Sequence, residues 1–246
     1  MWKLIQKFAS PQYFFTYSTK LINWIFYPFI LLTIIGLYLG LVVAPIDYQQ
    51  GDSYRIMFVH VPSAWMSMFI YVVMATSGAI GLIWKIKLAD IVAKVSAPIG
   101  AIFTFLALAT GSIWGKPMWG TWWVWDARLT SELILLFLYL GYIALQNSFD
   151  NPNTASKAST VLALVGIVNL PIIHYSVKWW NTLHQGASVS KIGAPSIHID
   201  MLIPLLLMAF AFQLFYILVV LKKAKNEVLI REQNTRWVKE VILEGK

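Results

Sequence analysis

The sequence predicts an all-α integral membrane protein: a six-helix transmembrane bundle with a tryptophan-rich outer loop and both termini in the cytoplasm. The first observation is composition, since 59% of the 246 residues are hydrophobic and only 12% are charged. A soluble domain carries about 25% charged residues. The second is the presence of six apolar stretches near the length of roughly 20 residues that a membrane helix needs. The third is the uneven placement of Lys and Arg between the two sides.

The six stretches are expected to be helices, because a helix satisfies its own backbone in lipid and an isolated strand does not. Their unbroken hydrophobicity also differs from the alternating pattern of an outer-membrane barrel. Residues 1–246 therefore form a single predicted membrane domain. Its spans are expected at about residues 21–44, 62–84, 91–113, 129–146, 158–176 and 201–221. Charged residues flank these stretches in turn: Lys20, Lys85, Lys116, Arg128, Lys157, Lys178 and Lys222.

Lys and Arg set the orientation, because positive residues are concentrated in cytoplasmic segments. Only five of the nineteen lie on the predicted outer side: Arg55, Lys116, Arg128, Lys178 and Lys191. The inner side has Lys3, Lys7, Lys20, Lys85, Lys87, Lys94, Lys157, Lys222, Lys223, Lys225, Arg231, Arg236, Lys239 and Lys246. The net charge of +8 is thus a topology signal and does not indicate nucleic-acid binding. Residues 222–246 are expected to form a cytoplasmic tail near the membrane surface.

The outer loops, at about 45–61, 115–128 and 177–200, hold most of the chemically unusual residues. Five of the twelve tryptophans fall within residues 114–128: Trp114, Trp119, Trp122, Trp123 and Trp125. Tryptophans commonly form belts at membrane interfaces. A belt does not require several on one glycine-broken loop, and such a cluster also makes a stiff apolar platform with N–H donors at its edges. The pattern favours a platform for a large flat ligand.

Two histidines in the outer segments are candidate metal ligands. His60 precedes the second span and His184 lies in the loop after the fifth. Each alone is more typical of a structural histidine, but two imidazoles beside an aromatic platform match the axial ligands and apolar walls that haem requires. His174, near the outer end of the fifth span, is a functional candidate because it is ionisable within a span, but a neutral histidine bonded to another helix is the favoured interpretation. His198, before the sixth span, is interpreted as structural. Without cysteine, thiolate ligation and covalent c-type attachment to this chain are excluded.

Charged residues around the platform leave two interpretations open. Arg55 and Arg128 could pair with the two propionates of haem, since Arg binds carboxylates bidentately. They could equally be helix-end charges paired with nearby acids. Asp126 could fix the loop by accepting backbone or indole hydrogen bonds, and Glu132 is expected to pair with Arg128 one helical turn away.

The segment Trp119–Asp126, WGTWWVWD, matches the tryptophan-rich signature of the WWD-domain haem-handling proteins. Together with six spans, the chain length and a histidine in each flanking outer loop, it makes the chain resemble the haem exporter protein C (CcmC) family of cytochrome c biogenesis. The GKPMWG lead-in and the segment NLPIIHYS strengthen the resemblance, which covers essentially the whole chain.

The resemblance implies a non-enzymatic, multi-pass protein of the bacterial inner membrane that holds haem b at the periplasmic face. His60 and His184 would be the axial ligands, with haem against the tryptophan loop. The implied partners are the periplasmic haem chaperone (CcmE), the ATPase and membrane subunits of an ABC transporter (CcmA and CcmB) and a small membrane peptide (CcmD).

Two other classes of membrane protein share parts of this pattern. The large haem lyases share the signature but resemble chains of many more spans. A small-solute transporter or channel subunit with an interfacial tryptophan belt would need buried mid-span polar residues or broken helices in paired halves, and such features are sparse here. The stretch 189–197 carries no predicted role.

Overall fold

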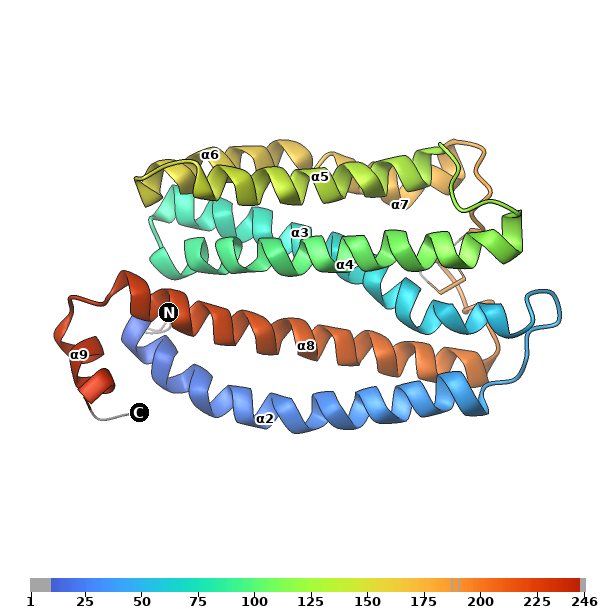
Figure 1. Ribbon diagram of the computed structural model, residues 1–246, viewed down its shortest axis with the longest axis horizontal. Coiled ribbons are helices and arrows are strands. Elements are labelled where there is room, and N and C mark those ends of the chain that lie inside the picture. The colour runs from blue at the N-terminus through green and yellow to red at the C-terminus, as the bar shows by residue number, and fades with distance from the viewer. Residues whose placement is uncertain (1–9, 187, 190, 244–246) are drawn as a thin grey trace.

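The computed structural model describes residues 10–186, 188–189 and 191–243, and it contains six helical segments long and apolar enough to cross a membrane (Figure 1). No β-strand occurs among these residues. The predicted class, a membrane protein with six helical spans, is therefore confirmed. The elements are α2 (Pro11–Tyr38) with its π-helical end η1 (Leu39–Val43), η2 (Asp52–Ile56), α3 (Met57–Trp84), α4 (Lys87–Trp119), α5 (Ala127–Asn147), α6 (Pro152–Gly166), α7 (Asn169–Trp179), α8 (Ile199–Arg231) and α9 (Arg236–Leu243).

The fifth span is the one that differs most from its expected form, because two helices, α6 and α7, replace a single helix. Pro171 has no backbone N–H to bond the carbonyl of Ile167, and its ring crowds that carbonyl. The backbone turns here, and the N–H of Leu170 bonds the Ile167 carbonyl at 3.1 Å instead. Pro171, four residues after Ile167, thus explains why the helix is interrupted at Ile167.

Several helices extend beyond the predicted spans. In particular, α4 continues to Trp119, so Trp114 and Trp119 lie on a helix and only residues 120–126 form an irregular loop. Gly120 ends α4 in the left-handed conformation, with φ of +73°, which glycine adopts without steric penalty. The predicted loop at 114–128 is therefore partly helical, and this fixes which of its rings can face the bundle interior.

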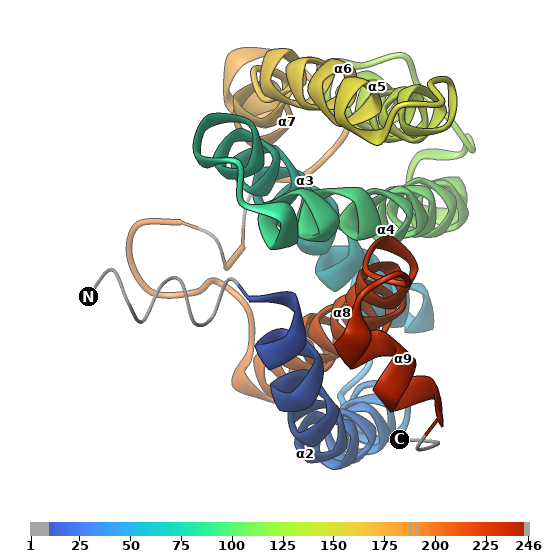
Figure 2. The same ribbon diagram turned by 90° about the vertical axis from the view of Figure 1, so that its left-hand side faces the viewer.

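The bundle has three layers (Figures 1 and 2). The antiparallel pair α3 and α4 lies in the middle, α2 packs beside α8 on one side, and α5 packs beside α6 and α7 on the other. The start of α2 and the helix α9 lie at the same end of the bundle, which Figure 2 faces. The loops 44–51 and 120–126 and the described loop residues 180–186 and 191–198 lie at the opposite end (Figure 1).

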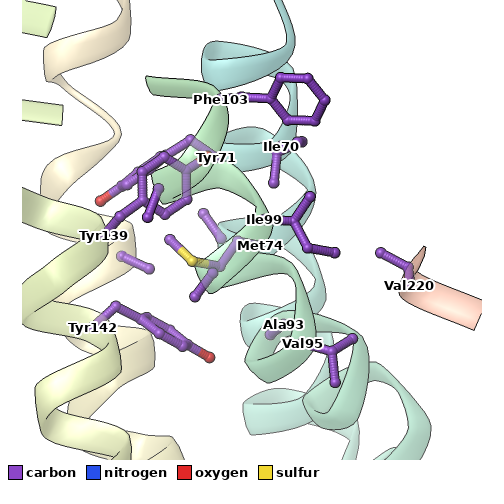
Figure 3. Packing of buried hydrophobic residues seen from close by; sticks show 14 of the residues in the cluster. Ile70, Tyr71, Met74, Ala93, Val95, Ile99, Phe103, Tyr139, Tyr142 and Val220 are labelled. Atoms are coloured by element: carbon purple, nitrogen blue, oxygen red, sulfur yellow. The ribbon is translucent and has the colours of Figure 1, made fainter. Parts of the chain in front are cut away.

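The core between α3, α4 and α5 is built around large aromatic side chains (Figure 3). Tyr71 and Tyr139 pack edge to face with ring centroids 5.2 Å apart. The ring of Tyr139 lies where a side chain on Gly100 would be, so glycine at this position lets α4 and α5 approach closely. This packing holds the three helices that carry most of the candidate site.

Ion pairs join the end opposite the predicted site. Arg231 donates to Asp90 at 2.6 Å and to Glu227 at 2.8 Å, and Lys94 also donates to Glu227 at 2.8 Å. These bonds tie the last turns of α8 to the first turns of α4. Of the predicted tail, residues 222–243 are helical except for a turn before Arg236. Residues 244–246, and the predicted inner lysines Lys3, Lys7 and Lys246, lie outside the described residues.

Candidate functional site

A cavity of about 260 Å³ lies at the end of the bundle that carries the long loops. Its walls come from α3, α4 and α5, with contributions from the loops before η2, after α4 and after α7. Both predicted metal ligands and one of the two predicted arginines line it. The lining of the cavity includes Gln50, His60, Gly111, Trp114, Trp119, Trp123, Arg128, Glu132 and His184.

The two imidazoles face the same cavity from different segments. His60 lies in the first turn of α3 and is 9% exposed, and His184 comes from the loop after α7. Their ring centroids are 6.3 Å apart and their planes differ by 32°. The structure thus brings together two residues that are 124 positions apart in the sequence.

Each imidazole is oriented through its Nδ1 atom. Nδ1 of His60 lies 3.1 Å from Oγ1 of Thr110 on α4, and Nδ1 of His184 lies 3.2 Å from the carbonyl oxygen of Gln185. Neither of these two contacts uses the Nε2 atom of the ring. Metal-bound histidines typically use one nitrogen for a second-shell hydrogen bond, which fixes ring orientation, and the other for the metal.

The pKa of His184 is lowered, first by burial against the cavity wall and then by the positive charge of Arg128. A lowered pKa keeps the imidazole neutral at pH 7. The neutral imidazole is the form that binds a metal.

The tryptophan segment has two faces. Trp114, Trp119 and Trp123 line the cavity, whereas Trp122 and Trp125 do not and are 55% and 77% exposed. Trp114 packs edge to face on His60 with centroids 5.6 Å apart, and Trp119 lies 6.0 Å from His184. The structure therefore brings three of the five predicted platform rings to the histidines and leaves two outside.

Two of the tryptophans that line the cavity, Trp114 and Trp123, differ in whether their indole N–H group has a hydrogen-bond partner. Nε1 of Trp114 donates to Oε1 of Gln50 at 2.9 Å, which ties the loop before η2 to α4. Nε1 of Trp123 is buried and has no hydrogen-bond partner among the described residues. A buried donor without a partner is unfavourable, so Trp123 is held in this position at a cost in stability.

Asp126 and Arg128 hold the outer end of α5. One carboxylate oxygen of Asp126 accepts from the N–H of Leu129 at 2.8 Å and caps the helix, which agrees with the loop-fixing interpretation. Nη1 of Arg128 donates to the carbonyl of Ile173 at 2.6 Å. No other hydrogen bond of this guanidinium occurs among the described residues, so its remaining donors are available at the cavity wall.

Arg55 is placed differently from Arg128. Its guanidinium donates to the carbonyls of Gly40 and Ala44 at 2.8 and 2.9 Å and to Asp52 at 2.8 Å. These bonds satisfy the end of η1, and Arg55 is not among the residues that line the cavity. Here the structure supports the helix-end interpretation.

Three further residues of the site either were not identified from the sequence or have a partner that differs from the expected one. Glu132 does not form the expected ion pair with Arg128, because its Oε1 accepts from Oγ of Ser67 at 2.7 Å. Thr110 and Gly111 contact His60 from α4. The sequence alone gives little indication of the roles of Thr110 and Gly111, because Thr and Gly are common in membrane helices and His60 is distant from both in the sequence.

The other two histidines lie apart from the cavity. His174 packs on its neighbour Tyr175 with centroids 4.7 Å apart. His198 caps the start of α8, where its Nδ1 accepts from the N–H of Asp200 at 3.3 Å. Both contacts are local, and no hydrogen bond from His174 to another helix occurs among the described residues.

The fold and the cavity together define a polytopic helical membrane protein with a two-histidine, tryptophan-lined site at one end. Residues 4–239 match the family model described as Heme exporter protein C. The chain is 50% identical to Heme exporter protein C of Haemophilus influenzae (97% of both chains) and 49% identical to that of Escherichia coli K12 (99% of this chain, 98% of the relative). It is also 48% identical to a "putative cytochrome c biosynthesis ccmC-like mitochondrial protein" of Marchantia polymorpha, over 80% of this chain and 82% of the relative. The chain belongs to the heme exporter protein C family.

Proposed function

We propose that this protein binds haem b between His60 and His184, and that it supports haem transfer to a periplasmic haem chaperone during cytochrome c biogenesis. Family membership supports a role in haem handling. The observation that carries the site is the pair of imidazoles, each oriented through Nδ1 and facing one tryptophan-lined cavity.

The spacing of the imidazoles fits two axial ligands on one metal. With metal–nitrogen bonds of about 2 Å, two such rings on opposite sides of a metal have centroids roughly 6 Å apart. The observed separation is 6.3 Å. Two ligands from the chain leave the equatorial positions to the porphyrin, and bis-imidazole coordination is a known form of haem ligation.

The walls of the cavity also fit haem. The rings of Trp114, Trp119 and Trp123 supply apolar surface for the porphyrin. The remaining donors of Arg128 match the anionic propionates, because a guanidinium forms strong hydrogen bonds with carboxylates. We assign Arg128 to a propionate, Asp126 to the geometry of the loop, and no direct haem contact to Arg55, Trp122 or Trp125.

The cellular setting follows from charge placement and from family membership. We infer an inner-membrane location, with the cavity facing the periplasm and both chain ends in the cytoplasm, because Lys and Arg are concentrated at the opposite end of the bundle. We also infer a non-catalytic role within an ABC-type exporter complex, with CcmA, CcmB and CcmD as subunits and CcmE as the haem acceptor. Reporter fusions at residues 85–90 and after Lys222 should report cytoplasm, and fusions at Lys116 should report periplasm. A periplasmic tail would contradict this orientation.

The absorbance spectrum of the purified protein tests the ligand assignment. The haem-loaded protein should show a low-spin bis-histidine spectrum. His60→Ala and His184→Ala should each change that spectrum, and added imidazole should restore it by filling the space of the lost ring. His198→Ala should leave it unchanged, since His198 caps α8. An unaltered spectrum in both ligand variants would remove the axial assignment.

A further inference from the structure

Glu132 is a buried acid in the cavity wall that the proposed haem site does not use. It lies on α5 one helical turn from Arg128, toward the membrane interior, and it is 7% exposed. Oγ of Ser67 donates to its Oε1 at 2.7 Å. No hydrogen bond to its Oε2 occurs within the described ranges, and this oxygen is not among the fully enclosed, unpartnered atoms of the structure. Glu132 therefore lies in the wall of the cavity that both histidines also line.

The surroundings of Glu132 make its presence unusual. The cavity wall also contains Ala64 on α3 and Ala107 and Leu108 on α4, none of which is charged. Burial alone disfavours the charged form of a carboxyl. The hydrogen bond from Ser67 and the positive charge of Arg128 act in the opposite direction and favour the carboxylate. Its nearest basic group on α5, Arg128, donates to the Ile173 carbonyl and forms no ion pair with it. The carboxyl is thus available to act on the contents of the cavity.

We propose that Glu132 sets the oxidation state of the bound haem by favouring ferric over ferrous iron. This inference rests on the proposed function, since it requires haem between His60 and His184. The ferric porphyrin core carries one positive charge that the ferrous core lacks. A carboxylate in the same low-dielectric cavity stabilises that charge, and net charge near the iron is one of the factors that set haem reduction potentials. Glu132 acts on the iron through space and is not a ligand.

The experiment is a spectroscopic redox titration of the purified, haem-loaded protein, with dithionite as reductant and ferricyanide as oxidant. Glu132→Gln keeps the shape and a hydrogen-bonding group toward Ser67 but removes the charge. At a fixed ambient potential the ferrous-to-ferric ratio should rise by about tenfold, which corresponds to about 59 mV for a one-electron couple. Glu132→Met, which removes the charge without leaving a polar group to satisfy, should shift the ratio in the same direction. Either variant that accumulates with haem is sufficient for the test.

The matched control is Glu240→Gln, the same substitution on α9 at the opposite end of the bundle. It should leave the ferrous-to-ferric ratio unchanged. A change smaller than about twofold, or 18 mV, in the neutral variants would overturn the assignment to Glu132. The proposed function fails separately, if the wild-type protein binds no haem or if its spectrum does not respond to His60→Ala and His184→Ala.

Discussion

Gly111 on α4 faces the ring of His60, so replacing it with alanine perturbs the proposed site without changing a ligand. A Cβ at this position would lie 2.9 Å from Cε1 and 3.4 Å from Nδ1 of His60. The ring would have to move by about 0.5 Å to restore the 3.4 Å at which ordinary contact begins. Functional geometry tolerates displacements of only about 0.5 Å.

The expected effects of Gly111→Ala on folding and on haem binding have opposite signs. Alanine within a helix is favoured over glycine by roughly 0.5–1 kcal/mol, which offsets the local overlap, so the haem-free protein should unfold at a similar or slightly higher temperature. The displaced ring loses the geometry of its bond to Thr110, which is 3.1 Å long. Loss of such a second-shell partner typically lowers metal affinity by about 10–100-fold, and we expect a decrease in haem affinity within this range.

A haem titration followed by Soret absorbance, together with thermal unfolding of the haem-free protein, measures both effects. Gly141→Ala on α5 is the matched control, because its Cβ would meet only the flexible end of Leu162 at 3.1 Å. That variant should bind haem normally. If Gly111→Ala also binds haem with unchanged affinity and an unchanged spectrum, the ring of His60 is not held against α4 as the structure implies.

Five further substitutions separate roles that the structure distinguishes. Trp123→Ala should lower haem occupancy measured as haem per protein, whereas Trp125→Ala, whose ring lies outside the cavity, should not; equal losses would contradict the two-faced arrangement. Arg55→Gln should destabilise the haem-free protein by about 1–3 kcal/mol, because buried carbonyls at the end of η1 lose their partner; loss of haem binding with unchanged stability would instead support a propionate contact. Tyr71→Phe should leave the unfolding temperature unchanged or raise it, since the Tyr71 hydroxyl is buried without a partner among the described residues. Tyr139→Phe removes a 2.7 Å bond to the Ser67 carbonyl and should lower the unfolding temperature.

Much of the architecture could be predicted because lipid imposes simple rules on a sequence. A helix is the form in which an isolated span satisfies its own backbone, so six apolar stretches were sufficient to predict six helical spans. The ends were less predictable, since helices such as α4 continue past the apolar stretch. The interruption at Pro171 had a local signal, namely a proline inside a predicted span, but hydrophobicity alone does not reveal it.

The candidate site was predictable where residue chemistry identifies a role and unpredictable where contacts decide it. His60, His184 and Arg128 could be proposed because two imidazoles and a guanidinium close to a tryptophan cluster match the needs of one ligand, and the structure places all three on one cavity. Arg55 has the same chemistry as Arg128, yet the backbone carbonyls within its reach belong to η1 and satisfy it. Glu132 follows the i,i+4 rule for pairing with Arg128, but the packing of α3 against α5 brings the hydroxyl of Ser67 to it instead. In both cases, a partner distant in sequence decides the role, and only the folded chain specifies that partner.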